Sequence, residues 1–223
     1  DRAKMTDAQK AAHEQLLAEL ASKGGGKGPS ASMTTTEALK TKQFWALWLT
    51  WAFMGAAGIS MVSMSKSYSV YLGITGVMAL TTFNLTNGVS RIIAGTLSDV
   101  IGRRTLGSVS FIIGAVGYIM LPRVSTLVPL CICTACVGYA FGTLFAISGP
   151  LTTDLFGLKY FGTIFGLVFT AYGFIGGILG PMVATAVLNS TGSYVPVFTY
   201  LAVFCVVAAV FIFFAKDSSA KSK

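Results

Sequence analysis

Six long apolar segments, separated by short polar stretches, constrain the fold more than any other feature of the chain. A helix of roughly 20 apolar residues crosses the hydrocarbon core of a bilayer, and it satisfies its own backbone hydrogen bonds where lipid offers no partner. The sequence therefore predicts an all-α membrane protein with six transmembrane helices, at Phe44–Met64, Gly76–Leu97, Thr105–Pro122, Leu127–Gly149, Phe161–Thr185 and Tyr194–Ala215.

Composition agrees with a membrane protein and divides the chain into three parts. Hydrophobic residues make up 54% of the 223 residues, charged residues only 11%, and the mean hydropathy is +0.73. We expect a polar linker over residues 1–42, a helical bundle over 43–215 and a polar tail over 216–223. The chain begins with Asp1, and no cleavable signal precedes the first span, so we expect a fragment.

The linker contains a candidate short helix and a flexible run. Thr6 and Gln9 have capping-box spacing, and Ala12, Leu16 and Leu20 share the apolar face of an amphipathic helix before a glycine-rich coil. Two interpretations stay open for this helix: it lies on the membrane surface, or it is solvated. The single histidine, His13, lies on it with no histidine or cysteine nearby, which indicates a surface residue.

Basic residues predict the orientation. The formal net charge is +8. If residues 1–42 are cytoplasmic, thirteen basic residues lie on that side: Arg2, Lys4, Lys10, Lys23, Lys27, Lys40, Lys42, Arg103, Arg104, Lys159, Lys216, Lys221 and Lys223. Only Lys66 and Arg123 lie on the opposite side. The positive-inside rule then places both ends of the chain in the cytoplasm, with the plasma membrane as the expected location. The soluble parts are too short for nucleic-acid binding.

Several residue types suggest sites that we do not expect to form. The cysteines Cys131, Cys133, Cys136 and Cys205 all lie inside apolar spans, where they are buried thiols rather than disulfides or metal ligands. A sequon at Asn189 falls in a short outer loop, 189–193, which is a poor glycosylation acceptor. We find no catalytic constellation typical of an enzyme, and no cofactor is expected.

One charge interrupts the apolar pattern at depth. Arg91 precedes Asp99 by eight residues, about 12 Å along a helix. Burial of an arginine in a span costs at least about 2.5–3.5 kcal/mol, so Arg91 is expected to face the protein interior or an aqueous cavity. Its guanidinium can bind a carboxylate with two parallel N–H donors, and a small organic anion is the expected ligand. Alternatively, Arg91 extends to the interface or pairs with Asp99.

The connection between the second and third spans carries a motif, Gly95-Thr-Leu-Ser-Asp99-Val-Ile-Gly102-Arg103-Arg104. It resembles the loop signature of the major facilitator superfamily. We expect Gly95 to allow close helix approach, Gly102 to allow the turn, and Asp99, Arg103 and Arg104 to stabilise one conformation at the cytoplasmic face. A solvated basic loop without a gating role is the alternative.

Three further stretches, at 36–45, 87–91 and 154–162, resemble oxalate/formate antiporters, a family related to the monocarboxylate transporters. The resemblance covers residues 36–215 and implies a twelve-helix fold, in which this chain supplies helices seven to twelve and an N-terminal six-helix half is the missing partner. It implies substrate transport by alternating access, with the lipid bilayer as the surrounding medium.

The departures from this family concern charge. Oxalate-exchanging members pair an arginine of helix eight with a lysine of helix eleven, and the Phe161–Thr185 span has no lysine. An arginine without the second cation favours a substrate with one carboxylate group, a monocarboxylate. Proton-coupled monocarboxylate transporters have an aspartate four residues before the arginine, and this chain has Asn87. With Arg91, we expect Asn87, Tyr139 and Tyr172 to bind the substrate.

The glycine-rich fifth span has two interpretations. Gly173 and Gly177 have small-xxx-small spacing, with Gly176 and Gly180 beside them and Pro181 following. They form either a hinge for a conformational change or a close helix contact.

Two alternatives to an organic-anion transporter remain from the sequence. One is a transporter of neutral or cationic solutes, in which Arg91 is structural, and the other is a non-transporting receptor or sensor of the same fold.

Overall fold

The computed structural model describes residues 32–74 and 77–215. The amphipathic helix expected near the N-terminus, His13 and the tail at 216–223 lie outside these ranges. The described elements are helical: α2 (Thr35–Leu39), α3 (Lys42–Tyr71), α4 (Met78–Ile101), α5 (Arg103–Met120), the 3₁₀ turn η2 (Leu121–Arg123), α6 (Leu127–Phe156), α7 (Phe161–Ala171), the π-helical segment η3 (Tyr172–Leu179), α8 (Gly180–Thr191) and α9 (Tyr194–Phe214).

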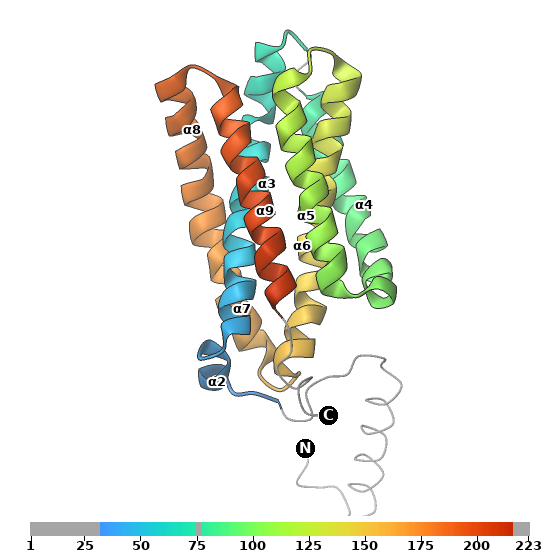
Figure 1. The fold of residues 1–223 in the computed structure, drawn as a ribbon, viewed down its shortest axis with the longest axis vertical. Helices are drawn as coiled ribbons and strands as arrows, with labels where there is room; N and C mark the ends of the chain where they lie inside the picture. The colour runs from blue at the N-terminus through green and yellow to red at the C-terminus, as the bar shows by residue number, and fades with distance from the viewer. Residues whose placement is uncertain (1–31, 75–76, 216–223) are drawn as a thin grey trace, which may run out of the picture.

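The long helices form one bundle whose axes run along its length (Figure 1). Helix α4 packs chiefly on α6, α5 packs between α6 and α9, and α3 packs on α9. The continuous rod of α7, η3 and α8 lies along the other side of α3. The predicted all-helical membrane bundle is confirmed.

Five helical rods among the described residues are long and apolar enough to cross a membrane: Lys42–Tyr71, Arg103–Arg123, Leu127–Phe156, Phe161–Thr191 and Tyr194–Phe214. The remaining predicted span is α4, which has 24 residues and is therefore long enough. Its composition is more polar, because Asn84, Asn87, Arg91 and Asp99 interrupt the apolar residues. The difference between five and six spans thus lies in the helix that carries the candidate site.

Several predicted boundaries were wrong. Helix α3 continues seven residues past Met64 to Tyr71, and α8 continues to Thr191, so the predicted loops at 65–75 and 189–193 are largely helical. Serine hydroxyls inside α3 bond to helix carbonyls one turn earlier, as Ser69 Oγ does to the Ser65 oxygen at 2.8 Å, and the helix therefore tolerates this polar stretch. The sequon at Asn189 lies in the last turns of α8.

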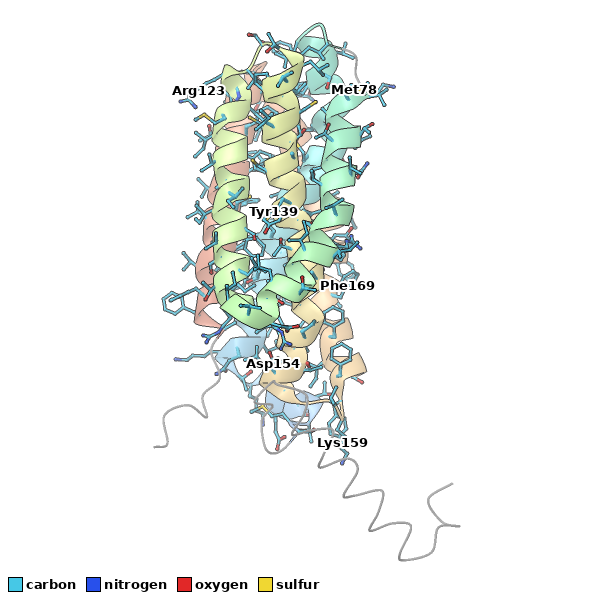
Figure 2. The ribbon with its side chains drawn as sticks, turned by 90° about the vertical axis from the view of Figure 1, so that its right-hand side faces the viewer. Met78, Arg123, Tyr139, Asp154, Lys159 and Phe169 are labelled. Atoms are coloured by element: carbon cyan, nitrogen blue, oxygen red, sulfur yellow. The ribbon has the colours of Figure 1, made fainter. Side chains whose placement is uncertain are left out.

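Proline does not end α6. Pro150 lies inside this helix, which continues to Phe156 rather than ending near Gly149. A proline removes one helical N–H and bends or breaks a helix when nothing compensates. The extension carries Asp154 to the end of the bundle, where it meets the turn between α4 and α5 (Figure 2).

The two ends of the bundle differ in charge. At one end, α3 begins, α4 turns into α5, and α6 and α9 end (Figure 1). The basic residues described there are Lys40, Lys42, Arg103, Arg104 and Lys159, whereas Lys66 and Arg123 lie toward the other end. We call the first of these the basic end.

Aromatic residues fill much of the core, and Tyr118 donates its hydroxyl hydrogen to the Ala57 carbonyl at 2.6 Å.

Candidate functional site

A polar stripe follows one face of α4. Asn84, Asn87 and Arg91 are three and four residues apart, which places them on one side of a helix. Arg91 lies ten residues before the end of α4 at Ile101, about 15 Å from that end. Asn84 was not among the residues predicted for the site, although its spacing from Arg91 would have indicated it.

Arg91 rests on an aromatic ring. Its guanidinium carbon, Cζ, lies 4.3 Å from the centroid of the Phe145 ring of α6, and its Nε donates to Asn87 Oδ1 at 3.4 Å. Tyr172 of η3 packs against the same Phe145 ring, with the two ring centroids 5.6 Å apart. Among the described residues, neither Nη atom of Arg91 has a recorded hydrogen bond or ion pair. The structure thus brings together Arg91, Asn87 and Tyr172, and it leaves the donors that bind carboxylates available.

Behind Arg91 lies an aromatic cluster drawn from α3, α6, α7 and η3: Trp51, Phe141, Phe145, Phe165, Phe169 and Tyr172. Trp51 is at its centre, with centroid distances of 4.9 Å to Phe145 and to Phe169 and 5.6 Å to Tyr172. Its side chain is fully buried, and its Nε1 has no hydrogen-bond partner among the described residues.

Sequence reasoning missed the role of Trp51. Trp45, Trp48 and Trp51 lie three residues apart near the start of α3, a position typical of indole rings that anchor a helix at the membrane boundary. Trp45 is half exposed, whereas Trp51 faces the interior. Each step of three residues moves further along α3, so the indole of Trp51, the third in the series, lies away from the end of the helix.

Two glycines of α6 set the position of α4. A Cβ added at Gly142 would overlap Ser90 Oγ and the Asn87 carbonyl oxygen, and one added at Gly138 would overlap the Phe83 carbonyl oxygen. These glycines are four residues apart, a spacing that lets helices approach closely in membranes. Close approach at Gly142 holds Asn87, and therefore Arg91, against α6.

Tyr139 was predicted to join the same site, but it lies elsewhere on α6. It lines a separate groove between α4 and α5, with Val89, Ile93 and Ile113 (Figure 2). No recorded contact of Tyr139 involves Arg91 in the described part of the chain.

At the basic end, the motif residues tie three helices together. Gly102 has φ +91° and forms the turn between α4 and α5, as its residue type predicts. Arg103 Nη2 lies 3.2 Å from Asp99 Oδ1, Nη1 forms a second ion pair with Asp154, and Nη1 also donates to the Pro150 carbonyl oxygen at 3.3 Å. Asp99 therefore pairs with Arg103, not with Arg91.

The other motif residues contribute less to these contacts. Arg104 is half-buried and has no recorded ion pair in the described ranges. A Cβ added at Gly95 would meet no described atom within 4 Å, so close helix approach does not occur there in this conformation. Asp154 was not predicted to contact Arg103, because residues 51 positions apart give no local spacing signal.

A second contact joins the basic end to the segment that precedes α3. The backbone N–H of Met33 donates to the Phe156 carbonyl oxygen at 3.0 Å, and Ser32 lies against Gly157, which has φ +80°. Thr34 caps α2, with its N–H donating to Glu37 Oε2 at 2.8 Å. The end of α6 and the turn after it therefore contact Ser32 and Met33, just before α2.

The glycines of the fifth span divide into two pairs. A Cβ at Gly176 or at Gly180 would press on Gly55 or Ala56 of α3, so this pair forms a close helix contact. A Cβ at Gly173 would meet no described atom within 4 Å, and one at Gly177 would meet only the Tyr172 carbonyl oxygen. All except Gly180 lie in η3, whose π-helical hydrogen bonding is less regular than that of an α-helix and frequently accompanies functional sites.

The site has the chemistry of anion binding. It combines one permanent positive charge, an amide, a phenol and an aromatic wall, and the described residues contain no group of histidine, cysteine or carboxylate side chains that could hold a metal ion. The acidic residues described are Glu37 in α2, Asp99 near the end of α4 and Asp154 near the end of α6, and these parts of the three helices lie at the basic end (Figure 1).

Comparisons with known proteins agree with this fold. Residues 43–223 match the model of the Major Facilitator Superfamily. An "Oxalate:formate antiporter" of Oxalobacter formigenes is 32% identical over 157 residues, which cover 67% of this chain and 38% of that protein. An "Uncharacterized MFS-type transporter YhjX" of Escherichia coli K12 is 24% identical over 147 residues, 63% of this chain and 36% of that protein.

The aligned region spans well under half the length of either relative. The family model covers most of the chain, including every long helix of the bundle. The chain therefore belongs to the Major Facilitator Superfamily.

Proposed function

We propose that this chain forms the C-terminal half of a secondary active transporter that moves a small organic anion by alternating access. The observation that carries the proposal is the arrangement of Arg91, which lies on the Phe145 ring with its Nη donors free of recorded partners among the described residues. A charge at this depth is too costly against lipid, and it is explained by an aqueous pathway through which a carboxylate reaches it.

The proposed substrate site contains Arg91, Asn87 and Tyr172. Two Nη donors bind the two oxygens of a carboxylate, while Asn87 fixes Nε of the guanidinium and the Phe145 face supports it. The oxalate:formate antiporter among the relatives favours a small carboxylate. Arg91 is the one cation that the described residues place at this site, since the α7–η3–α8 rod contains no lysine, and one cation favours a substrate with one carboxylate group over one with two.

In the proposed mechanism, the bundle faces a second six-helix half across the polar stripe of α4, and the two halves rock about the substrate. The Asp99–Arg103–Asp154 contacts stabilise one orientation at the basic end, which is cytoplasmic by the positive-inside rule. Gly173 and Gly177 allow η3 to change its hydrogen bonding as the rod bends. Transport consists of these movements and involves no covalent chemistry.

Substitution of Arg91 tests the proposal. Cells expressing the complete transporter with Arg91→Gln are expected to lose uptake of labelled formate, acetate and oxalate while keeping the protein in the membrane. Arg91→Lys is expected to fail as well, because a lysine cannot donate two parallel hydrogen bonds from a planar group. Normal carboxylate uptake by Arg91→Gln would remove this residue from the site.

Two other functions predict different results. A transporter of neutral or cationic solutes takes up none of the labelled carboxylates, and its uptake of those solutes survives Arg91→Gln. A receptor or sensor binds a carboxylate without flux. Quenching of Trp51 fluorescence by added carboxylate reports binding separately, because Trp51 lies 4.9 Å from the ring that supports Arg91.

A further inference from the structure

A groove on the outside of the bundle lies apart from the proposed substrate site. It opens between α4 and α5, and α6 forms its floor (Figure 2). The volume is about 340 Å³. The lining residues are Thr86, Val89, Ser90, Ile93, Ile113, Ala135, Cys136 and Tyr139.

The rim of the groove is apolar and exposed. Val89 and Ile93 of α4 are each 46% exposed, and Ile113 of α5 is 37% exposed. The outer face of α5 is also apolar and exposed, at Val109, Ile112 and Val116. On α4 this rim is separate from the polar stripe that carries Arg91, so the two faces of the helix meet different surroundings.

Water finds few partners inside the groove. Thr86 Oγ1 donates to the Thr82 carbonyl oxygen at 2.8 Å, and Ser90 Oγ donates to the Asn87 carbonyl oxygen at 2.9 Å. Both hydroxyls are therefore engaged with their own helix. A buried water needs two to four polar partners, and the remaining lining offers little beyond the Tyr139 phenol.

The surrounding medium then determines the occupant. α5 belongs to a rod that is long and apolar enough to cross a membrane, and α4 runs beside it, so we expect the exposed valines and isoleucines of the rim to face the hydrocarbon of the bilayer. An unfilled groove forfeits the dispersion contacts of its lining, which a flexible hydrocarbon chain can restore. No described lysine or arginine lines the groove, so nothing there selects a charged headgroup.

We propose that the α4–α5 groove is a binding site for one acyl chain of a bilayer phospholipid, which inserts between the two helices and reaches Ala135, Cys136 and Tyr139 on α6. Such a chain fills the space between α4 and α5 and contacts the helix that supports Arg91 from the opposite side. Recognition is by chain shape and is independent of the headgroup.

A photoactivatable lipid tests the site. The complete transporter is placed in phosphatidylcholine nanodiscs that contain a trace of phosphatidylcholine with a diazirine in mid-chain, and labelled peptides are mapped after irradiation. We expect label on Ala135, Cys136 and Tyr139, which form the floor of the groove between α4 and α5 and are only partly exposed. Val203 on α9, 53% exposed, serves as the internal reference for surrounding lipid.

Filling the groove provides the matched variant. Ala135→Phe is expected to lower floor labelling roughly fivefold or more, because a phenyl ring takes the space of the chain, while labelling at Val203 stays unchanged. If Ala135→Phe does not fold, Val89→Phe narrows the groove from the rim and is expected to reduce the same labels. Replacing the probe headgroup by phosphatidylglycerol is expected to leave the pattern unchanged.

Four outcomes overturn the proposal. They are an unlabelled floor, floor label that survives both filling variants, labelling that depends on the headgroup, and label displaced by free oleate but not by excess unlabelled phosphatidylcholine. The last outcome assigns the groove to a free fatty acid. None of these results bears on carboxylate transport, which Arg91→Gln tests separately.

Discussion

The guanidinium carbon of Arg91 lies 4.3 Å from the centroid of the Phe145 ring, and this contact joins α4 to α6 at the candidate site. A cation above an aromatic face is stabilised by the ring quadrupole, and the ring leaves the edges of the guanidinium free for hydrogen bonds. Phe145 therefore supports the cation without competing with a carboxylate for its N–H donors.

Phe145→Leu is the first prediction. Loss of the cation–π contact is expected to weaken carboxylate binding by about 0.5–2 kcal/mol, or roughly 2- to 30-fold in Kd. Titration of carboxylate against the intrinsic tryptophan fluorescence measures the change. Phe53→Leu is the matched control, because Phe53 packs on Phe204 and Phe211 of α9, away from Arg91. Equal losses in the two variants would indicate a general packing effect instead.

Gly142→Ala is the second prediction. The added methyl overlaps the Asn87 carbonyl oxygen and Ser90 Oγ, so α4 must move away from α6. We expect a cost of about 1–3 kcal/mol, seen as a lower Tm, together with weaker carboxylate binding because Asn87 and Arg91 move with α4. Gly166→Ala is the control, since a Cβ there meets no described atom within 4 Å. A Gly142→Ala protein with unchanged Tm and binding contradicts the role assigned to this glycine.

The architecture could be predicted from the sequence, because helices surrounded by lipid must be long and apolar. The length of the apolar segments indicated the helices, and the position of Arg91 well inside a span indicated the polar face of α4. Helix ends were less predictable, as in α3, where a helix leaves the apolar region and continues for as long as its backbone hydrogen bonds persist. Composition marks the hydrocarbon boundary, which is different from the end of a helix.

Site partners distant in sequence were not predictable in the same way. Phe145, Trp51 and Asp154 acquire their roles from contacts between helices, and no local spacing shows which ring will lie under Arg91 or which carboxylate will reach Arg103. Tyr139 illustrates the same limit. It was expected to bind the substrate with Arg91, but it lies on the part of α6 that faces the α4–α5 groove.

Low pH is expected to loosen α2. The Thr34 N–H donates to the Glu37 carboxylate, and this hydrogen bond, which favours the charged form, holds the pKa of Glu37 below its ordinary value. A lowered folded pKa stabilises the cap at pH values above the pKa of the unfolded glutamate, and this contribution disappears as the pH falls through the folded pKa. Hydrogen exchange at the amides of α2 should therefore accelerate on acidification, beyond the intrinsic pH effect.

Glu37→Gln controls for this titration. A glutamine can accept the same hydrogen bond from Thr34 but carries no titratable group, so its corrected exchange rate should not respond to pH in the acid range. If the wild-type and Glu37→Gln proteins show the same pH dependence, the carboxylate does not determine the stability of the cap.

Asp154→Asn and Asp99→Asn compare two carboxylates that share one arginine. The Asp154 side chain is 33% exposed and the Asp99 side chain 66%, while Arg103 itself is 21% exposed. Weaker solvent screening makes the Asp154 pair the stronger one, and its loss also leaves Arg103 Nη1 with only the Pro150 carbonyl. We expect a stability loss of about 1–3 kcal/mol for Asp154→Asn and below about 0.5 kcal/mol for Asp99→Asn. Tm values of the purified variants measure both, and a larger loss for Asp99→Asn would assign the principal contact to α4 rather than to α6.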